Sequence, residues 1–163
     1  MDTWSAEIGP HRLAGILIDT NLLLLYAVGL CNPSLVARFK RTNRYTADDF
    51  RFVRDLAQRF RRLVTTPHIL AEVSNLAIDR DGPRAPHFSS LVRVLRAAHE
   101  LYVCKDDVLS SDAFGRFGAT DAATITLGLR ERYLVLTDDF AVAGYLRAAR
   151  RFALTLAQLR GKR

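Results

Sequence analysis

Two short apolar runs in this chain each lead directly to aspartate. The first, within residues 15–19, ends at Asp19, and the second, within 133–137, is followed by Asp138 and Asp139. A helical pattern follows each run, which is typical of buried strands in a parallel α/β sheet. Ligands bind such sheets in the crevice outside the carboxyl ends of the strands. The sequence therefore predicts acidic side chains at the edge of the sheet where a binding site is expected.

Strand-like and helix-like patterns alternate along the rest of the chain, which favours one parallel α/β domain. The predicted strands cover residues 15–19, 63–66, 101–104, 133–137 and 152–156. The predicted helices cover residues 21–30, 34–40, 46–62, 67–78, 88–100, 110–117, 121–131 and 140–151. Thr46 and Asp49 resemble a capping box at the start of the third helix. Residues 81–86 and 118–120 are predicted as a loop and a turn. Residues 1–14 show no periodicity and are predicted as an arm before a single domain, 15–163.

Charge and cysteine content narrow the class of protein. The 163 residues carry a net charge of +7, which fits an acidic partner such as nucleic acid, although a coding bias toward arginine also explains it. Cys31 and Cys104 are too few for a disulfide framework or a thiolate zinc site, so we expect free thiols and a cytoplasmic location. The apolar stretch 13–31 contains Asp19. Since an aspartate at the centre of a membrane span costs about 2.5–3.5 kcal/mol, we expect no membrane segment there.

Two further acids, Glu72 and Asp121, lie within otherwise apolar helical stretches. Charged residues are rarely buried unless they are paired or bind metal. Four acids have no basic neighbour in the sequence: Asp19, Glu72, Asp121 and Asp139. Carboxylates are ligands that Mg²⁺ prefers, and a shared divalent ion would offset their repulsion and promote phosphodiester hydrolysis. Taken singly, each aspartate could equally cap a helix, and Glu72 could be a partly exposed helix residue.

Four segments carry these acids in order. They are IDTN at 18–21, TPHILAEV at 66–73, ATDA at 119–122 and LTDDF at 136–140. Together, each in its predicted strand or helix, they resemble the PIN-domain ribonucleases, and among them the VapC-type toxins. The resemblance covers nearly all of residues 15–159. It implies a three-layer, Rossmann-like α/β/α sandwich with a central parallel sheet, and Mg²⁺- or Mn²⁺-dependent cleavage of RNA.

The resemblance also assigns roles to individual residues. The catalytic acids that it implies are Asp19, Glu72, Asp121 and Asp139. Asp19, Asp121 and Asp139 are expected to hold the metal, and Glu72 the metal or its bound water. Supporting roles fall to three further residues: Asn21, Thr137 and Asp138. Asn21 and Thr137 match polar positions that orient ligands or water, whereas Asp138 fills a variable position.

The stretch between the first two acids is longer than in the short toxins of this family. It is predicted as a basic helical insertion at about 32–62, where residues 38–62 hold nine basic and three acidic residues with aromatics interleaved. Phosphate contact and base stacking on RNA would explain this composition, and so would a solvated helical face with its aromatics in the core. The candidate RNA-binding residues are Arg38, Lys40, Arg41, Arg44 and Arg51.

The sequence therefore predicts a metal-dependent endoribonuclease with RNA as substrate. If the protein is a toxin, we expect a small antitoxin that brings an arginine or lysine to the acidic groove, and the family resemblance implies a homodimer. The alternative is a non-catalytic PIN-like RNA-binding or scaffold protein, which has no use for four clustered carboxylates. A HAD-type phosphatase needs an acid two residues after its nucleophilic aspartate, where this chain has Asn21. No glycine-rich phosphate loop is present.

Overall fold

A five-stranded parallel sheet forms the centre of the computed structural model, which describes residues 5–78 and 85–161. The strands are β1 (Ile16–Ile18), β2 (Leu63–Thr65), β3 (His99–Glu100), β4 (Leu134–Thr137) and β5 (Ala153–Thr155). Their order in space is β3-β2-β1-β4-β5, and every neighbouring pair is parallel. Strands β1 and β4 are buried along their whole length, as strands covered by helices on both faces should be.

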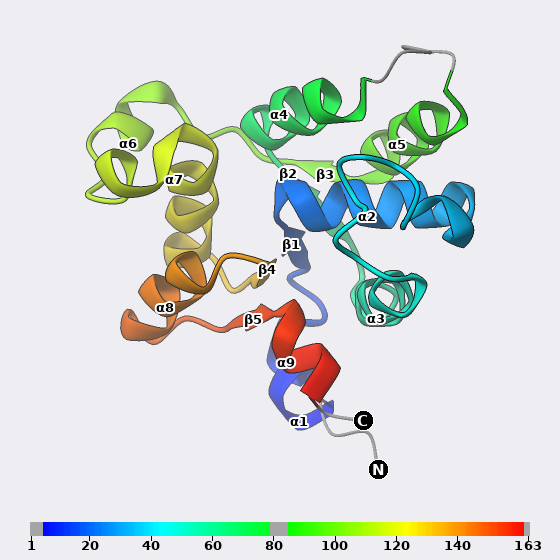
Figure 1. Cartoon of the computed structure of the whole chain (residues 1–163). Helices are drawn as coiled ribbons and strands as arrows, with labels where there is room; N and C mark the ends of the chain where they lie inside the picture. Colours follow the sequence, from blue (N-terminus) through cyan, green and yellow to red (C-terminus); the bar gives the residue numbers. More distant parts are fainter. Residues whose placement is uncertain (1–4, 79–84, 162–163) are drawn as a thin grey trace.

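Helices cover both faces of the sheet. They are α1 (Ser5–Ile8), α2 (Thr20–Cys31), α3 (Ala47–Ala57), α4 (Pro67–Ala77), α5 (Pro86–Ala97), α6 (Lys105–Leu109), α7 (Phe114–Arg130), α8 (Phe140–Ala148) and α9 (Leu156–Gly161), with 3-10 turns η1 (Gly9–His11) and η2 (Pro33–Leu35). Helices α2, α3 and α5 lie on one side of the sheet, and α6, α7 and α8 on the other (Figure 1). The predicted three-layer α/β/α sandwich with a central parallel sheet is thus confirmed.

The direction of the chain across the sheet reverses once. From β1 the chain crosses to β2 and then to β3, whereas β4 returns to the other side of β1 and is followed by β5. The reversal occurs between the paired strands β1 and β4, so their carboxyl ends form the topological switch point, where open α/β sheets bind ligands. Residues that directly follow β1 and β4 therefore meet at one place.

Short polar side chains start the helices that follow the strands. Asp19 accepts a hydrogen bond from the Leu22 amide and caps α2. Thr46 and Asp49 form the capping box that the sequence predicts at α3, and Thr66 caps α4 ahead of Pro67. These caps satisfy amides that the first turn of a helix leaves without partners. They also set where each helix begins, and so which side chains face the switch point.

Several predicted boundaries differ from the structure. Of the predicted helix 34–40 only η2 is regular, and the third helix ends at Ala57 rather than at residue 62. The predicted strand 101–104 is wrong, because the strand is β3, two residues earlier. Helices 110–117 and 121–131 are joined as α7, in which Gly118 has a φ of 82° at the predicted turn. Helices α1, α6 and α9 were not predicted, and most of the predicted loop 81–86 lies outside the described residues.

The described part of the predicted arm packs against the domain. Ile8 is only 1% exposed, the His11 Nδ1 lies 2.7 Å from the Arg132 carbonyl oxygen, and the His11 ring stacks on Phe152. Cys31 and Cys104 are free thiols. Among the described residues, the structure holds no helix with the length and apolar character needed to span a membrane.

Candidate active site

A cavity of about 510 Å³ opens at the carboxyl ends of β1 and β4. All four predicted catalytic acids line it, together with Asp138: Asp19, Glu72, Asp121, Asp138 and Asp139. They come from the β1–α2 junction, from α4, from α7 and from the β4–α8 junction. Asn21, Thr20 and Arg44 complete its polar lining. The fold thus gathers at the switch point acids that are widely separated in the sequence.

Asp19 is held rigidly at the base of this cavity. Its carboxylate accepts hydrogen bonds from the Leu22 amide at 2.8 Å, from the Thr137 hydroxyl at 2.7 Å and from the Asp138 amide at 2.6 Å. The residue is 8% exposed. Burial raises the pKa of Asp19, and the three hydrogen bonds oppose that rise. Asp19 is therefore a helix cap and a cavity acid at once.

Thr137 joins the two strand-end acids. Besides donating to Asp19, its hydroxyl oxygen accepts a hydrogen bond from the Asp139 amide at 3.0 Å. One oxygen of Asp139 in turn accepts from the amides of Ala141 and Val142 at 2.6 and 3.1 Å, which caps α8. The last residue of β4 thus links Asp19 to Asp139 through one hydroxyl group.

The pKa of Asp121 reflects its burial and the negative charge of the cavity. Burial and, to a smaller extent, the negative charges of Asp19, Asp139 and Glu72 together raise its pKa to about 6. The Asp121 carboxylate forms no hydrogen bond or ion pair with the residues that the structure describes. Glu72, in contrast, accepts a hydrogen bond from the Thr20 hydroxyl at 3.1 Å. Four carboxylates therefore share one space, and like charges in such proximity disfavour the ionisation of Asp121.

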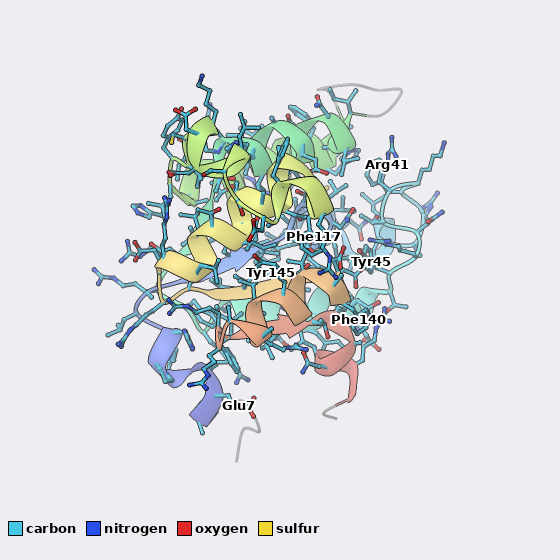
Figure 2. The ribbon with its side chains drawn as sticks, turned by 90° about the vertical axis from the view of Figure 1, so that its left-hand side faces the viewer. Glu7, Arg41, Tyr45, Phe117, Phe140 and Tyr145 are labelled. Carbon is cyan, nitrogen blue, oxygen red and sulfur yellow. The ribbon has the colours of Figure 1, made fainter. Side chains whose placement is uncertain are left out.

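A basic loop reaches the cavity on its remaining side. Arg44 lies 3.1 Å from the Asp138 carboxylate, and the Tyr45 hydroxyl donates to the same oxygen at 2.8 Å. Arg44 also donates to the Tyr45 hydroxyl at 2.5 Å. Burial and the hydrogen bond to Asp138 raise the pKa of Tyr45. Tyr45 and Phe140 lie on the same edge of the molecule in Figure 2. The loop after η2 is thereby tied to the β4–α8 junction.

Only one of the five candidate RNA-binding residues lines the cavity. That residue is Arg44, whereas Arg38, Lys40 and Arg41 are exposed elsewhere on the loop and Arg51 pairs with Asp48 on the surface. Most of the interleaved aromatics are buried in the core: Phe39, Tyr45, Phe50 and Phe60. The insertion is therefore part of the folded core on one face, and Arg44 is its contribution to the cavity.

Three residues at the cavity had no assigned role in the sequence interpretation. Thr20 donates to Glu72, Tyr45 holds Asp138, and Phe140 lines the opening while 66% exposed. Phe140 and Thr20 directly follow predicted acids, so their position next to the site was visible in the sequence. Tyr45 contacts a residue 93 positions away, and nothing local in the sequence signals that contact.

The carboxylates do not form a ready-made ion site. Among the described residues, no three histidine, cysteine, aspartate or glutamate side chains are arranged to hold a metal together. Asp19 and one oxygen of Asp139 accept hydrogen bonds from protein donors, as described above, although the Asp19 oxygen that bonds only the Leu22 amide keeps a second lone pair for a ligand. Among the four predicted catalytic acids, the oxygens that accept no hydrogen bond from the described residues are both oxygens of Asp121 and the second oxygens of Asp139 and Glu72. Hard oxygen donors of this kind suit Mg²⁺ or Mn²⁺.

The fold and the cavity define an α/β sandwich with an acidic site at its topological switch point. Comparisons with protein-family models, with curated proteins and with solved structures found no match to this chain. Its function is therefore inferred from the residues of the cavity and from the resemblance of the four acidic segments.

Proposed function

We propose that this protein is a divalent-metal-dependent endoribonuclease of the PIN-domain type. One observation carries the proposal: the pKa of Asp121 is raised to about 6 by burial and by three further carboxylates that line the same cavity. An uncompensated acidic cluster destabilises the fold at neutral pH. A cation bound among the carboxylates offsets that repulsion, which would explain why four acids are placed together.

The donor set fits a hard cation. The cavity lining contains no histidine or cysteine, and carboxylate oxygens select Mg²⁺ or Mn²⁺ over softer metals. Asp19, Asp121 and Asp139 would hold the ion, with Glu72 beside it. When bound, such an ion polarises a phosphoryl oxygen and activates water. The chain itself orients Asp19 through Thr137, and the second oxygen of Glu72 is open to orient the attacking water.

Three further features support a nucleic-acid substrate. Arg44 is the one basic side chain among the residues that line the acidic cavity, and an arginine is suited to contact a phosphate. Phe140 exposes its ring at the same opening, where a base can stack on it. The net charge of +7 favours association with a polyanion. The preference for RNA over DNA comes from the resemblance to the PIN-domain ribonucleases.

The test is cleavage of labelled single-stranded RNA and of the matching DNA, each with millimolar Mg²⁺ or with EDTA. We expect RNA cleavage in Mg²⁺ alone, and a loss of about 100-fold or more in Asp121→Asn. Asp112→Asn, at an exposed acid outside the cavity lining, is the matched control and should cut normally. Cleavage that persists in EDTA, or in Asp121→Asn at the control rate, would contradict the proposal. RNA binding without cleavage would favour the scaffold alternative.

The resemblance to VapC-type toxins extends the proposal to a partner protein. An antitoxin that brings an arginine or lysine to the acidic cavity would compete with Arg44 for Asp138. Expression of the wild-type chain should then arrest growth, expression of Asp121→Asn should not, and co-expression of the antitoxin should restore growth. Normal growth during expression of a chain that is active on RNA counts against a toxin role but leaves the nuclease proposal intact.

A further inference from the structure

A second cavity, of about 530 Å³, lies between α2, α3 and α5, beside the start of β2. Figure 1 shows α2 passing between α3 and α5. None of its lining residues lines the acidic cavity. Much of its surface is apolar and is formed by Tyr26, Leu30, Phe60, Leu63 and Val94. Its volume is in the range of pockets that hold one small ligand, about 300–1,000 Å³.

The charge of this cavity is opposite to that of the acidic one. Three arginines line it, Arg61, Arg62 and Arg93, and no aspartate, glutamate or histidine does. Within residues 5–78 and 85–161, no ion pair joins any of the three to an acid. Other arginines of the chain do pair, as Arg44 does with Asp138 and Arg160 with Asp49. In the part of the chain that the structure describes, the cavity thus presents three arginines that have no acidic partner.

The arginines project from fixed backbone. The Arg61 amide donates to the Arg12 carbonyl oxygen at 2.9 Å, and the Arg62 carbonyl oxygen accepts from the Ile16 amide at 3.1 Å. Arg93 lies in the middle of α5. Because the backbone is held in place, binding an anion here requires ordering only of side chains, which lowers the entropic cost of binding.

A buried hydroxyl without a partner also lines this cavity. Ser90 is 2% exposed, and its Oγ forms no hydrogen bond. A buried polar group in that state destabilises the fold, and a ligand oxygen that enters deeply enough to reach the hydroxyl would give it a partner. Tyr26 is a second polar residue of the lining, and burial raises the pKa of its phenol above the usual value.

We propose that this cavity binds a small organic anion. An apolar or aromatic body would pack on Leu63 and Val94, and a phosphate, sulfonate or carboxylate group would meet the arginines and the Ser90 hydroxyl. A nucleic-acid backbone needs the arginines but has no use for the apolar floor or for a buried hydroxyl. The proposal is independent of the nuclease activity, because the two cavities share no residue.

The probe for the test is 8-anilinonaphthalene-1-sulfonate, which joins an aromatic body to one anionic group, titrated into the native full-length chain. We expect saturable binding of one molecule per chain. Arg93→Gln should weaken binding about 10-fold, as expected for loss of a charged hydrogen-bond donor. Arg96→Gln is the matched control, since it removes one exposed arginine from the same helix outside the cavity, and it should bind as wild type does.

Two further variants separate binding from folding. Ser90→Ala removes a hydroxyl that has no partner, so its melting temperature should equal or exceed that of wild type while probe affinity falls. Ala97→Trp, at an exposed position of the lining, should block the cavity by its size. Equal affinity of Arg93→Gln and Arg96→Gln, or full binding to Ala97→Trp, would overturn the proposal. Displacement of the probe by a single-stranded oligouridylate would also overturn it, and would make the cavity a nucleic-acid contact.

Discussion

The Asp19 carboxylate serves the fold and the cavity at the same time. It caps α2, bonds Thr137 of β4 and accepts the Asp138 amide. Caps and ligands are usually treated as alternatives for an acid at a strand end, but here three hydrogen bonds hold a cavity acid in place. Substitution of Asp19 therefore mixes structural and chemical effects. Asp121, which forms no such hydrogen bonds with the described residues, is the cleaner probe of the site.

The pKa of Asp121 makes stability depend on pH. Its carboxyl titrates near 3.8 in the unfolded chain and at about 6 in the fold, so the folded state binds the proton more tightly between these values. The free energy of unfolding should fall as pH rises through this window. In EDTA at about pH 7.5, Asp121→Asn should be more stable than wild type by about 1 kcal/mol after allowance for solvent screening.

Urea unfolding at about pH 3.5 and pH 7.5 checks this expectation. The difference between Asp121→Asn and wild type should nearly disappear at the lower pH, where Asp121 is protonated in the folded chain and mostly protonated in the unfolded chain. Asp112→Asn serves as the control at an exposed acid. An Asp121→Asn chain less stable than wild type at the higher pH would show that the carboxylate stabilises the apo fold.

Arg44 and Arg41 differ in position but carry the same charge. Arg44 lines the acidic cavity beside Asp138, whereas Arg41 is exposed outside it and is labelled in Figure 2. Arg44→Ala should weaken binding of single-stranded RNA about fivefold or more, as for loss of a direct phosphate contact. Arg41→Ala should have a smaller effect, which reflects long-range charge alone. Fluorescence anisotropy in the Asp121→Asn background measures RNA affinity without cleavage. Equal losses of affinity in Arg44→Ala and Arg41→Ala would show that Arg44 makes no direct contact with RNA at the site.

At the level of elements, local chemistry was predictable and distant pairing was not. The capping box at Thr46 and Asp49 and the turn at Gly118 involve residues within a few positions of one another. Strand β3 has two exposed residues and no apolar run, so its position depends on pairing with β2. Residues 36–40, after η2, were predicted as helix and 41–45 as a loop, yet the whole segment is a loop, held by the hydrogen bond of the buried Thr42 to the Val36 carbonyl oxygen and by the contact of Tyr45 with Asp138. A periodic pattern of apolar residues carries no information about contacts between residues so far apart in the sequence.

The packing of α2 against α3 depends on one glycine. A Cβ added at Gly29 would lie 2.2 Å from ring atoms of Phe50, a buried residue of α3. Gly29→Ala should destabilise the protein by about 1–3 kcal/mol through overpacking, although alanine favours helix. Gly144→Ala is the matched control, because nothing lies within 4 Å of its added Cβ in α8. It should stabilise the protein by about 0.5–1 kcal/mol. Thermal unfolding of both variants gives the comparison, and stabilisation by Gly29→Ala would contradict this packing.

At the scale of the whole molecule, the site is a consequence of topology. Parallel strands deliver their carboxyl ends to one edge, and the reversal between β1 and β4 leaves the crevice there. That part of the site was predictable, because strand-end acids and helix acids can be read from the sequence. The positions of Arg44 and Tyr45 beside Asp138 were not predictable, since they depend on how a long connection folds back over that edge.

An acidic site built in this way should respond to divalent ions as a whole-molecule property. Binding to the native state alone stabilises a protein by about 2.7 kcal/mol at 100 times the dissociation constant, and for a chain of this size each kcal/mol raises the melting temperature by about 2–4 °C. Millimolar Mg²⁺ or Mn²⁺ should therefore raise the melting temperature of wild type above that in EDTA at matched ionic strength. Asp121→Asn, which keeps the hydrogen bonds of Asp19 and Asp139 but loses one of the open carboxylates, should gain less. An identical rise in melting temperature in both proteins would show that the ion binds elsewhere. If the melting temperature of wild type does not rise, the proposed metal-dependent chemistry is wrong.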